Sequence, residues 1–262
     1  MNGLSPSLWA EALKVRRSKM FLITVIFFAF IACMMGLMML VVRHPELAGR
    51  SAALSAKASF LGNGDWPSYL PLLVQVMLSL GPIGFGMVTS WVFGREYVDH
   101  TSKDLLALPV PRLAFVTAKL ITILAWCLVL TLVFLITALL LALVMGLPGW
   151  SAVMVLHAYA IIVVSSLLTM LLCTPVAFLA CLSRGYLLPV GFAIFTLILT
   201  NFVAIGLPGI LPYFPWAVPA LYTGMAGADL PPAGTISYIV LALTSIGGFL
   251  TTAVWWHKAD QT

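Results

Sequence analysis

The chain has 262 residues, of which 62% are hydrophobic and 8% charged, and its mean hydropathy is +1.12. A soluble domain is nearer 45–50% apolar and about 25% charged, so the polar residues here are too few to cover a soluble surface. The formal net charge of +5 is small and one-sided, which favours membrane topology and anionic headgroups over nucleic acid. We therefore predict an all-α polytopic membrane protein, with room for six spans at about 20 residues each but not for a separate soluble domain.

The first segment, residues 5–19, begins with a Ser-Pro pair that is typical of a helix start. On a helical projection Trp9 lies on the apolar face, and Glu11, Lys14 and Arg17 lie on the polar face. This pattern predicts an in-plane interface helix with Trp9 toward the lipid and the charged side chains toward the headgroups. The alternative is a ragged start to the first span that acts as a positive-inside anchor.

Six apolar stretches follow, and the predicted spans are residues 20–42, 69–93, 120–145, 152–182, 186–207 and 239–256. The second span contains GPIGFG, which is typical of a kink or of close small-residue packing. The fourth span is long, so it is tilted, broken near Thr174-Pro175, or projects from the bilayer. Residues 208–238 contain six prolines and almost no charge, and predict a re-entrant or interfacial hairpin on the outer face before the last span.

The distribution of Lys and Arg predicts the orientation. Ten of the 13 lie on the side that holds both termini and the segment between spans two and three, whereas the other three are Arg43, Arg50 and Lys57. The positive-inside rule then places both termini in the cytoplasm. We expect a multi-pass protein of a bacterial cell membrane.

The sequence contains no ATP-binding phosphate loop, since no Gly is followed by Lys. It also lacks the zinc-protease motif H-E-x-x-H and the hydrolase motif G-x-S-x-G, so we do not expect an enzyme. The four cysteines lie in apolar runs, away from His at ligand spacing, and we expect them to be small buried residues. Gln75 and Asn201 fall inside spans, either as interhelical hydrogen-bonding residues or as part of a substrate path.

The longest polar stretch is residues 93–120, which we call the hinge segment. Its mixed charges predict a docking surface for an external motor, because the bundle has no visible energy source of its own. An amphipathic connector resting on the headgroups is the alternative.

The hinge segment resembles the cytoplasmic loop of ABC type-2 exporter permeases. The matching residues are Phe93-Gly94-Arg95-Glu96, Thr101, Leu105-Leu106, Pro109, Arg112 and Lys119. In this motif His100 stands just before Thr101, where the family often has Gly. The segment with Glu11, Lys14 and Arg17-Ser18 is similar to the N-terminal interface helix of that family. The small size is most similar to permeases for bacitracin and lantibiotic export or immunity.

The resemblance implies a pair of permease subunits, a second copy or a related permease, each seated on a separate ABC ATPase that binds ATP and Mg. The pair would move an amphiphilic substrate, such as a peptide antibiotic, lipid or drug, out of the cell or membrane. A coupling helix would occupy part of residues 94–119. The expected ATPase-docking residues are Arg95, Glu96, Asp99, Thr101, Lys103, Asp104, Leu105, Leu108 and Arg184. The remaining alternatives are an intramembrane lipid-modifying enzyme and a passive channel or scaffold.

Overall fold

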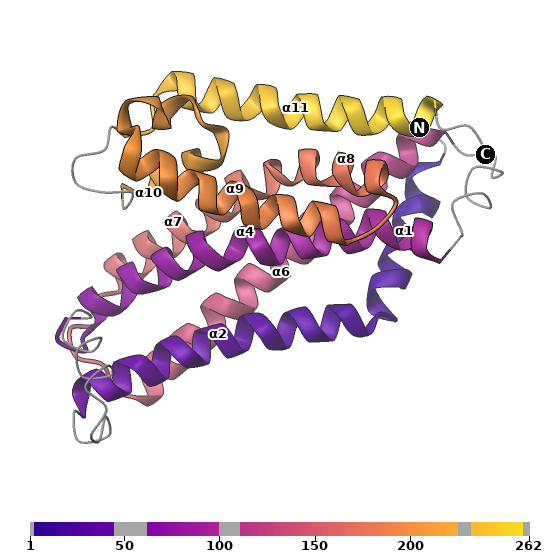
Figure 1. The fold of residues 1–262 in the computed structure, drawn as a ribbon. Helices are drawn as coiled ribbons and strands as arrows, with labels where there is room; N and C mark the ends of the chain where they lie inside the picture. The colour runs from indigo at the N-terminus through magenta and orange to yellow at the C-terminus, as the bar shows by residue number, and fades with distance from the viewer. Residues whose placement is uncertain (1–2, 45–61, 100–110, 225–231, 259–262) are drawn as a thin grey trace.

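A computed structural model describes residues 3–44, 62–99, 111–224 and 232–258 (Figure 1). Throughout these ranges the ordered elements are helices and no strand occurs, which confirms the all-α prediction. The elements are α1 (Leu4–Arg16), α2 (Lys19–Arg43), α4 (Trp66–Val98), α6 (Arg112–Val144), α7 (Ala152–Leu171), α8 (Cys173–Ser183), α9 (Leu187–Gly206), the 3-10 helices η2 (Pro208–Tyr213) and η3 (Pro215–Ala217), α10 (Val218–Thr223) and α11 (Thr235–Lys258).

Six helical segments are long and apolar enough to cross a membrane, namely α2, α4, α6, α7 with α8, α9 and α11. Their number agrees with the six predicted spans. Figure 1 shows both termini, α1 and α8 at one end of the bundle, which we call the basic end, and α10 at the opposite end.

Helices α4 and α6 extend beyond their predicted spans into the two ends of the hinge segment. Both α4 and α6 contain 33 residues, which corresponds to a length of roughly 50 Å, against about 30 Å for the hydrocarbon core of a bilayer. Residues 94–98 and 112–119 are therefore helical and continue α4 and α6 into the segment between the two spans, and the predicted span boundaries at residues 93 and 120 stay predictions. Only residues 100–110 of the hinge segment lie outside the described ranges, and the predicted coupling helix falls largely on them.

Short polar contacts fix where the long helices begin and end. The Asp65 carboxylate accepts a hydrogen bond from the Ser68 backbone N–H at 3.0 Å, and the Ser18 hydroxyl accepts one from the Met20 N–H at 2.9 Å. Both are N-cap contacts that satisfy otherwise free backbone donors. At the C-terminal end of α6, the side chain of Arg43, the last residue of α2, donates to the Met145 carbonyl oxygen at 2.6 Å.

The main core lies where α2, α4, α6, α7 and α8 pack, and α4 passes through Pro71 and Pro82 as one helix. The rings of Phe28 and Phe85 stack with centroids 5.9 Å apart. A Cβ added at Gly84 would lie 2.6 Å from the Phe28 ring, so only glycine permits this approach. The structure thus supports the small-residue packing interpretation of GPIGFG at this position.

The fourth span is interrupted at Leu172, between α7 and α8, close to the break predicted near Thr174-Pro175. Helix α11 satisfies the polar groups that the break exposes. The Thr174 hydroxyl donates to the Ser245 carbonyl oxygen at 2.8 Å, and the Ser245 hydroxyl donates to the Leu171 carbonyl oxygen at 2.9 Å.

The proline-rich segment forms η2, η3 and α10 in place of a continuous helix, as its composition predicted. Leu211, Ala217 and Leu221 are buried there and form a small apolar cluster. Its predicted entry into the membrane stays a prediction, and α11 begins at Thr235, four residues before the expected start of the last span.

Candidate functional site at the hinge segment

Four charged side chains from three helices form an ion cluster, which we define as Glu11, Lys14, Glu96 and Lys119. The Lys119 Nζ lies 2.7 Å from Glu96 Oε1 and 3.2 Å from Glu11 Oε1. The Lys14 Nζ lies 2.8 Å from Glu96 Oε1 and 2.7 Å from Glu11 Oε1. Each ammonium group therefore bridges both carboxylates, and the cluster is neutral as a unit.

The three helices place these side chains through ordinary helical geometry. Glu96 lies in the last turn of α4, and Lys119 lies about two turns into α6. Glu11 and Lys14 are three residues apart on α1, the spacing that puts two side chains on one helix face. The cluster joins the helices on both sides of residues 100–110 to each other and to α1.

Three of the four cluster residues, Glu11, Glu96 and Lys119, are buried, and Lys14 is partly exposed. Lys119 is 0% exposed and Glu96 is 2% exposed, and Lys119 also donates to the Val92 carbonyl oxygen at 3.1 Å. Removing charges from water costs several kcal/mol per ion, and pairing offsets that cost only where the geometry is good. Among the described residues nothing donates a hydrogen bond to the second carboxylate oxygen of Glu96. The charge of Glu96 is therefore balanced by Lys14 and Lys119, which both contact its first carboxylate oxygen.

Electrostatics in the cluster favour the charged form of each α1 residue. Burial alone would raise the pKa of Glu11, but Lys119 and then Lys14 outweigh it and hold that pKa below its ordinary value. Burial likewise opposes the charged form of Lys14, yet Glu96 and Glu11 raise its pKa above the ordinary value. Both α1 residues are therefore ionised at neutral pH.

A second contact ties the hinge segment to the last helix. Arg112, the first residue of α6, donates to the Trp256 carbonyl oxygen at 3.1 Å and to the His257 carbonyl oxygen at 2.5 Å. These are terminal carbonyl groups of α11, where a cation interacts favourably with the helix dipole. The start of α6 is thus fixed to α1 through Lys119 and to α11 through Arg112.

Comparison with known proteins agrees with this arrangement. Residues 7–200 match the family described as ABC-2 family transporter protein, a range that includes all four members of the ion cluster. The chain is also 31% identical over 199 residues to the bacitracin transport permease protein BCRB of Bacillus licheniformis, covering 75% of this chain and 90% of that protein. No solved structure matches the chain significantly.

The chain belongs to the ABC-2 transporter family. It is a multi-pass membrane subunit of an ABC transporter rather than an enzyme, as the sequence predicted. The family match begins within α1 and ends within α9, and α11 lies beyond it.

Of the nine residues of this ABC-2 permease that we predicted to dock an ATPase, four lie in the described ranges. Arg95 forms an ion pair with Asp99 at 2.9 Å, one turn apart at the end of α4, and Arg184 lies exposed in a left-handed conformation with φ of 51°. Glu96 is the fourth. The other five lie outside the described residues, and their docking role stays a prediction: Thr101, Lys103, Asp104, Leu105 and Leu108.

Two expectations about charged side chains were wrong. Glu96 does not lie on an exposed docking face, because its carboxylate is buried between the two lysines of the cluster. Glu11 does not face the headgroups, because α1 packs against α6 and buries Glu11 beside Lys119. Of the other predicted interface residues, Arg17 and Trp9 are exposed and Lys14 is partly exposed.

The sequence interpretation named Lys119 only as part of the family resemblance and missed its burial among carboxylates. We placed it at the boundary of a span, whereas it lies within α6 on the stripe that also buries Val116 and Ile123. A lysine on the apolar face of a helix requires a buried carboxylate partner, and this signal could have linked it to Glu11 or Glu96. Sequence alone does not say which.

The structure brings Gln75 and Asn201 together at a second location, which we call the polar cavity. It has a volume of about 260 Å³ and lies between α4, α7, α9 and the segment from Leu211 to Ala220. Its polar lining is neutral, with no charged side chain among the described lining residues: Gln75, Ser79, Thr169, Thr196, Thr200 and Asn201. Hydroxyl and amide groups of this kind orient a ligand that also makes apolar contacts.

Proposed function

We propose that this ABC-2 permease exports an amphiphilic substrate, driven by a separate ABC ATPase that docks on the hinge segment and itself binds ATP with Mg and hydrolyses it. The observation that carries the proposal is the ion cluster. It joins the end of α4, the start of α6 and α1 at the two flanks of residues 100–110. A force applied to the hinge segment therefore reaches three helices at once.

The link from Arg112 to the end of α11 extends this connected unit to the last span. Paired charges in a low-dielectric interior resist separation, since each partner left alone costs about 3–5 kcal/mol. Movement of the hinge segment then displaces whole helices in preference to bending their ends. This is the behaviour that a transporter without its own ATP site needs.

The polar cavity supports the substrate class. Neutral hydrogen-bonding groups mixed with Leu78, Leu197 and Trp216 suit a molecule with a neutral polar part and an apolar part. The bacitracin transport relative adds a peptide antibiotic to the candidate substrates, beside lipids and drugs. We propose transport out of the cell or membrane, with both termini in the cytoplasm, because the basic end holds most of the Lys and Arg residues.

We also propose that two permeases pair. Gln75 is exposed on the predicted second span, and among the described residues its side-chain amide has no hydrogen-bond partner, whereas lipid satisfies none. A second copy or a related permease that covers this face would supply hydrogen-bond partners and remove the free-energy cost of exposing polar groups to lipid.

The test is co-purification of the tagged chain with its ATPase in mild detergent, followed by measurement of ATP hydrolysis. We expect wild-type chain to retain an ATPase, and Asp104→Lys to lose it while the permease still folds. Arg16→Glu is the matched control, because Arg16 is exposed at the basic end and lies outside the predicted docking set. Equal recovery of the ATPase with all three proteins would remove the hinge segment from its docking role.

A further inference from the structure

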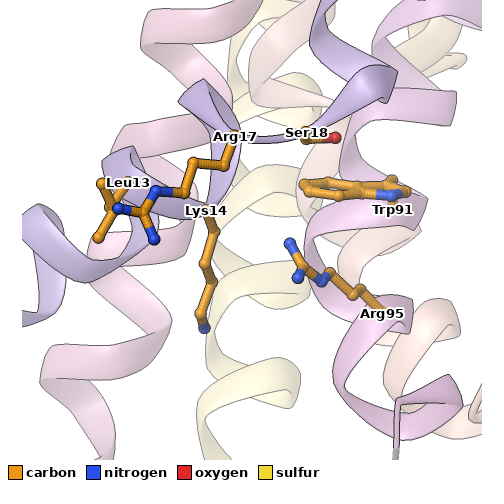
Figure 2. A pocket seen from close by; sticks show the side chains of 6 residues that line it. All are labelled: Leu13, Lys14, Arg17, Ser18, Trp91 and Arg95. Atoms are coloured by element: carbon orange, nitrogen blue, oxygen red, sulfur yellow. The ribbon is translucent and has the colours of Figure 1, made fainter.

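A basic pocket lies between the end of α1 and α4, beside the ion cluster. Its volume is about 360 Å³, and it is lined by Leu13, Lys14, Arg17, Ser18, Trp91 and Arg95. Figure 2 shows Arg95 pointing from α4 toward α1, with the Trp91 indole above it. Lys14 comes from the facing helix α1 and Arg17 is its C-cap residue, with a side chain that extends away from Arg95 and ends beside Leu13.

The pocket carries a surplus of positive charge. Lys14 is neutralised within the ion cluster, and Arg95 is paired with Asp99 through side chains that are 34% and 47% exposed. Arg17 has no ion-pair partner among the described residues. An anion that entered the pocket would therefore meet one unpaired guanidinium group and a second whose existing pair is screened by water.

The remaining lining residues suit a phosphate group attached to an apolar tail. The Arg95 guanidinium lies 5.0 Å from the centroid of the Trp91 ring, and tryptophan is enriched where membrane helices meet the headgroups. The Ser18 hydroxyl accepts from the Met20 N–H, which leaves its own proton free to donate. Leu13 adds an apolar wall.

We infer that this pocket binds the phosphate headgroup of an anionic phospholipid. Arg95 donates to the phosphate oxygens, and so does Arg17 once its exposed side chain turns from its place beside Leu13 toward Arg95. A guanidinium fork is suited to this geometry, and Ser18 donates to the same group. Trp91 and Leu13 contact the glycerol and the first acyl carbons. A lipid held there stabilises α1 against α4 from outside the ion cluster, and the inference does not depend on an ATPase or on export.

The test is native mass spectrometry of the full chain in mild detergent, titrated with phosphatidylglycerol or phosphatidylcholine. We expect preferential retention of phosphatidylglycerol, and a loss of about fivefold in its affinity for Arg17→Gln, the factor expected for one cation at an anionic surface. Arg17→Lys keeps the charge and retains most of the affinity. Arg16→Gln is the matched control, since Arg16 is the exposed neighbour that does not line the pocket.

Arg17 is exposed, so its replacement leaves the fold intact, which unchanged thermal unfolding of each variant would verify. Equal phosphatidylglycerol affinity for wild type, Arg17→Gln and Arg16→Gln would overturn the inference. Inorganic phosphate is added in a separate titration. If it displaces the lipid and binds with the same dependence on Arg17, the pocket belongs to a soluble phosphate compound and the lipid assignment is overturned.

Discussion

The ion cluster and the polar cavity are both polar regions of a membrane protein, yet they are built from different chemistry. The cluster pairs two buried carboxylates with two ammonium groups at distances of 2.7–3.2 Å. The cavity is lined by amides and hydroxyls, and several of these, such as Asn201 to the Leu197 carbonyl oxygen at 2.9 Å, already bond within their own helix. Charges in a low dielectric fix geometry strongly, whereas neutral groups rearrange at small cost. This difference fits the roles proposed above, in which the ion cluster transmits force and the polar cavity adapts to a ligand.

The largest expected effect is that of Lys119→Met, which tests whether the ion cluster holds its three helices together. Without the ammonium group, Glu11 and Glu96 share only Lys14, and one buried negative charge is left uncompensated. We expect a loss of about 3–5 kcal/mol in the free energy of unfolding, the usual cost of removing one partner of a buried pair. Thermal unfolding of the purified chain in detergent measures it.

The double variant Glu96→Gln with Lys119→Met is the control, because it removes one charge of each sign. We expect it to recover part of the lost stability, since the remaining Glu11 and Lys14 still form their own pair at 2.7 Å. If Lys119→Met were as stable as wild type, the cluster would not be the rigid unit that the proposed function requires.

The next effect concerns Arg112→Gln, which weakens the contact between the hinge segment and α11. Hydrogen bonds from a charged donor contribute roughly 1.5–3 kcal/mol, and Arg112 reaches two carbonyl oxygens of the last turn of α11. We expect a loss of about 2 kcal/mol and faster hydrogen exchange near Trp256, with little change in α1. Exchange that rose equally in α1 and α11 would contradict the separation of the two contacts.

The sequence predicted the helices well and the cluster poorly, for a physical reason. Hydropathy identifies a span because each of its residues contributes locally, and all six predicted spans coincide with helices long enough to cross a membrane. It does not show how far a helix continues outside the lipid, and α4 and α6 continue as helices over residues 94–98 and 112–119. Residues such as Glu96 and Lys119 lie in those extensions.

The partners in the cluster are set by tertiary packing, which one sequence does not contain. Helical spacing indicates the Glu11–Lys14 pair, but Lys14 and Glu96 are 82 residues apart and Glu11 and Lys119 are 108 apart. Gln75 and Asn201 illustrate the converse case. Their polarity inside spans predicted that they matter, and only the packing of α4 against α9 shows that they line one cavity.

A smaller effect, on ligand response rather than stability, is expected from Asn201→Leu in the polar cavity. Its side chain is exposed, so we expect the unfolding free energy to change by less than about 0.5 kcal/mol. If a substrate bonds to this amide, the substrate concentration for half-maximal ATPase stimulation should rise up to about tenfold, the upper range for one hydrogen bond. Phe202→Leu is the matched control, because Phe202 is the exposed neighbour that does not line the cavity. An identical response in both variants would argue against a substrate path there.

The smallest effect is the pH dependence that Glu11 gives to the ion cluster. Because Lys119 and Lys14 hold the pKa of Glu11 below its ordinary value of 4.5, the unfolded chain binds this proton more readily than the folded one. The stabilisation is therefore complete above pH 4.5 and is lost as pH falls through the lowered folded pKa. We expect the difference in melting temperature between wild type and Glu11→Gln to be constant near neutral pH and to narrow below 4.5. Asp99→Asn, which alters an exposed pair, should show a much smaller difference throughout. A gap for Glu11→Gln that did not narrow in acid would mean that burial and shape, rather than the charge of Glu11, fix α1 against α6.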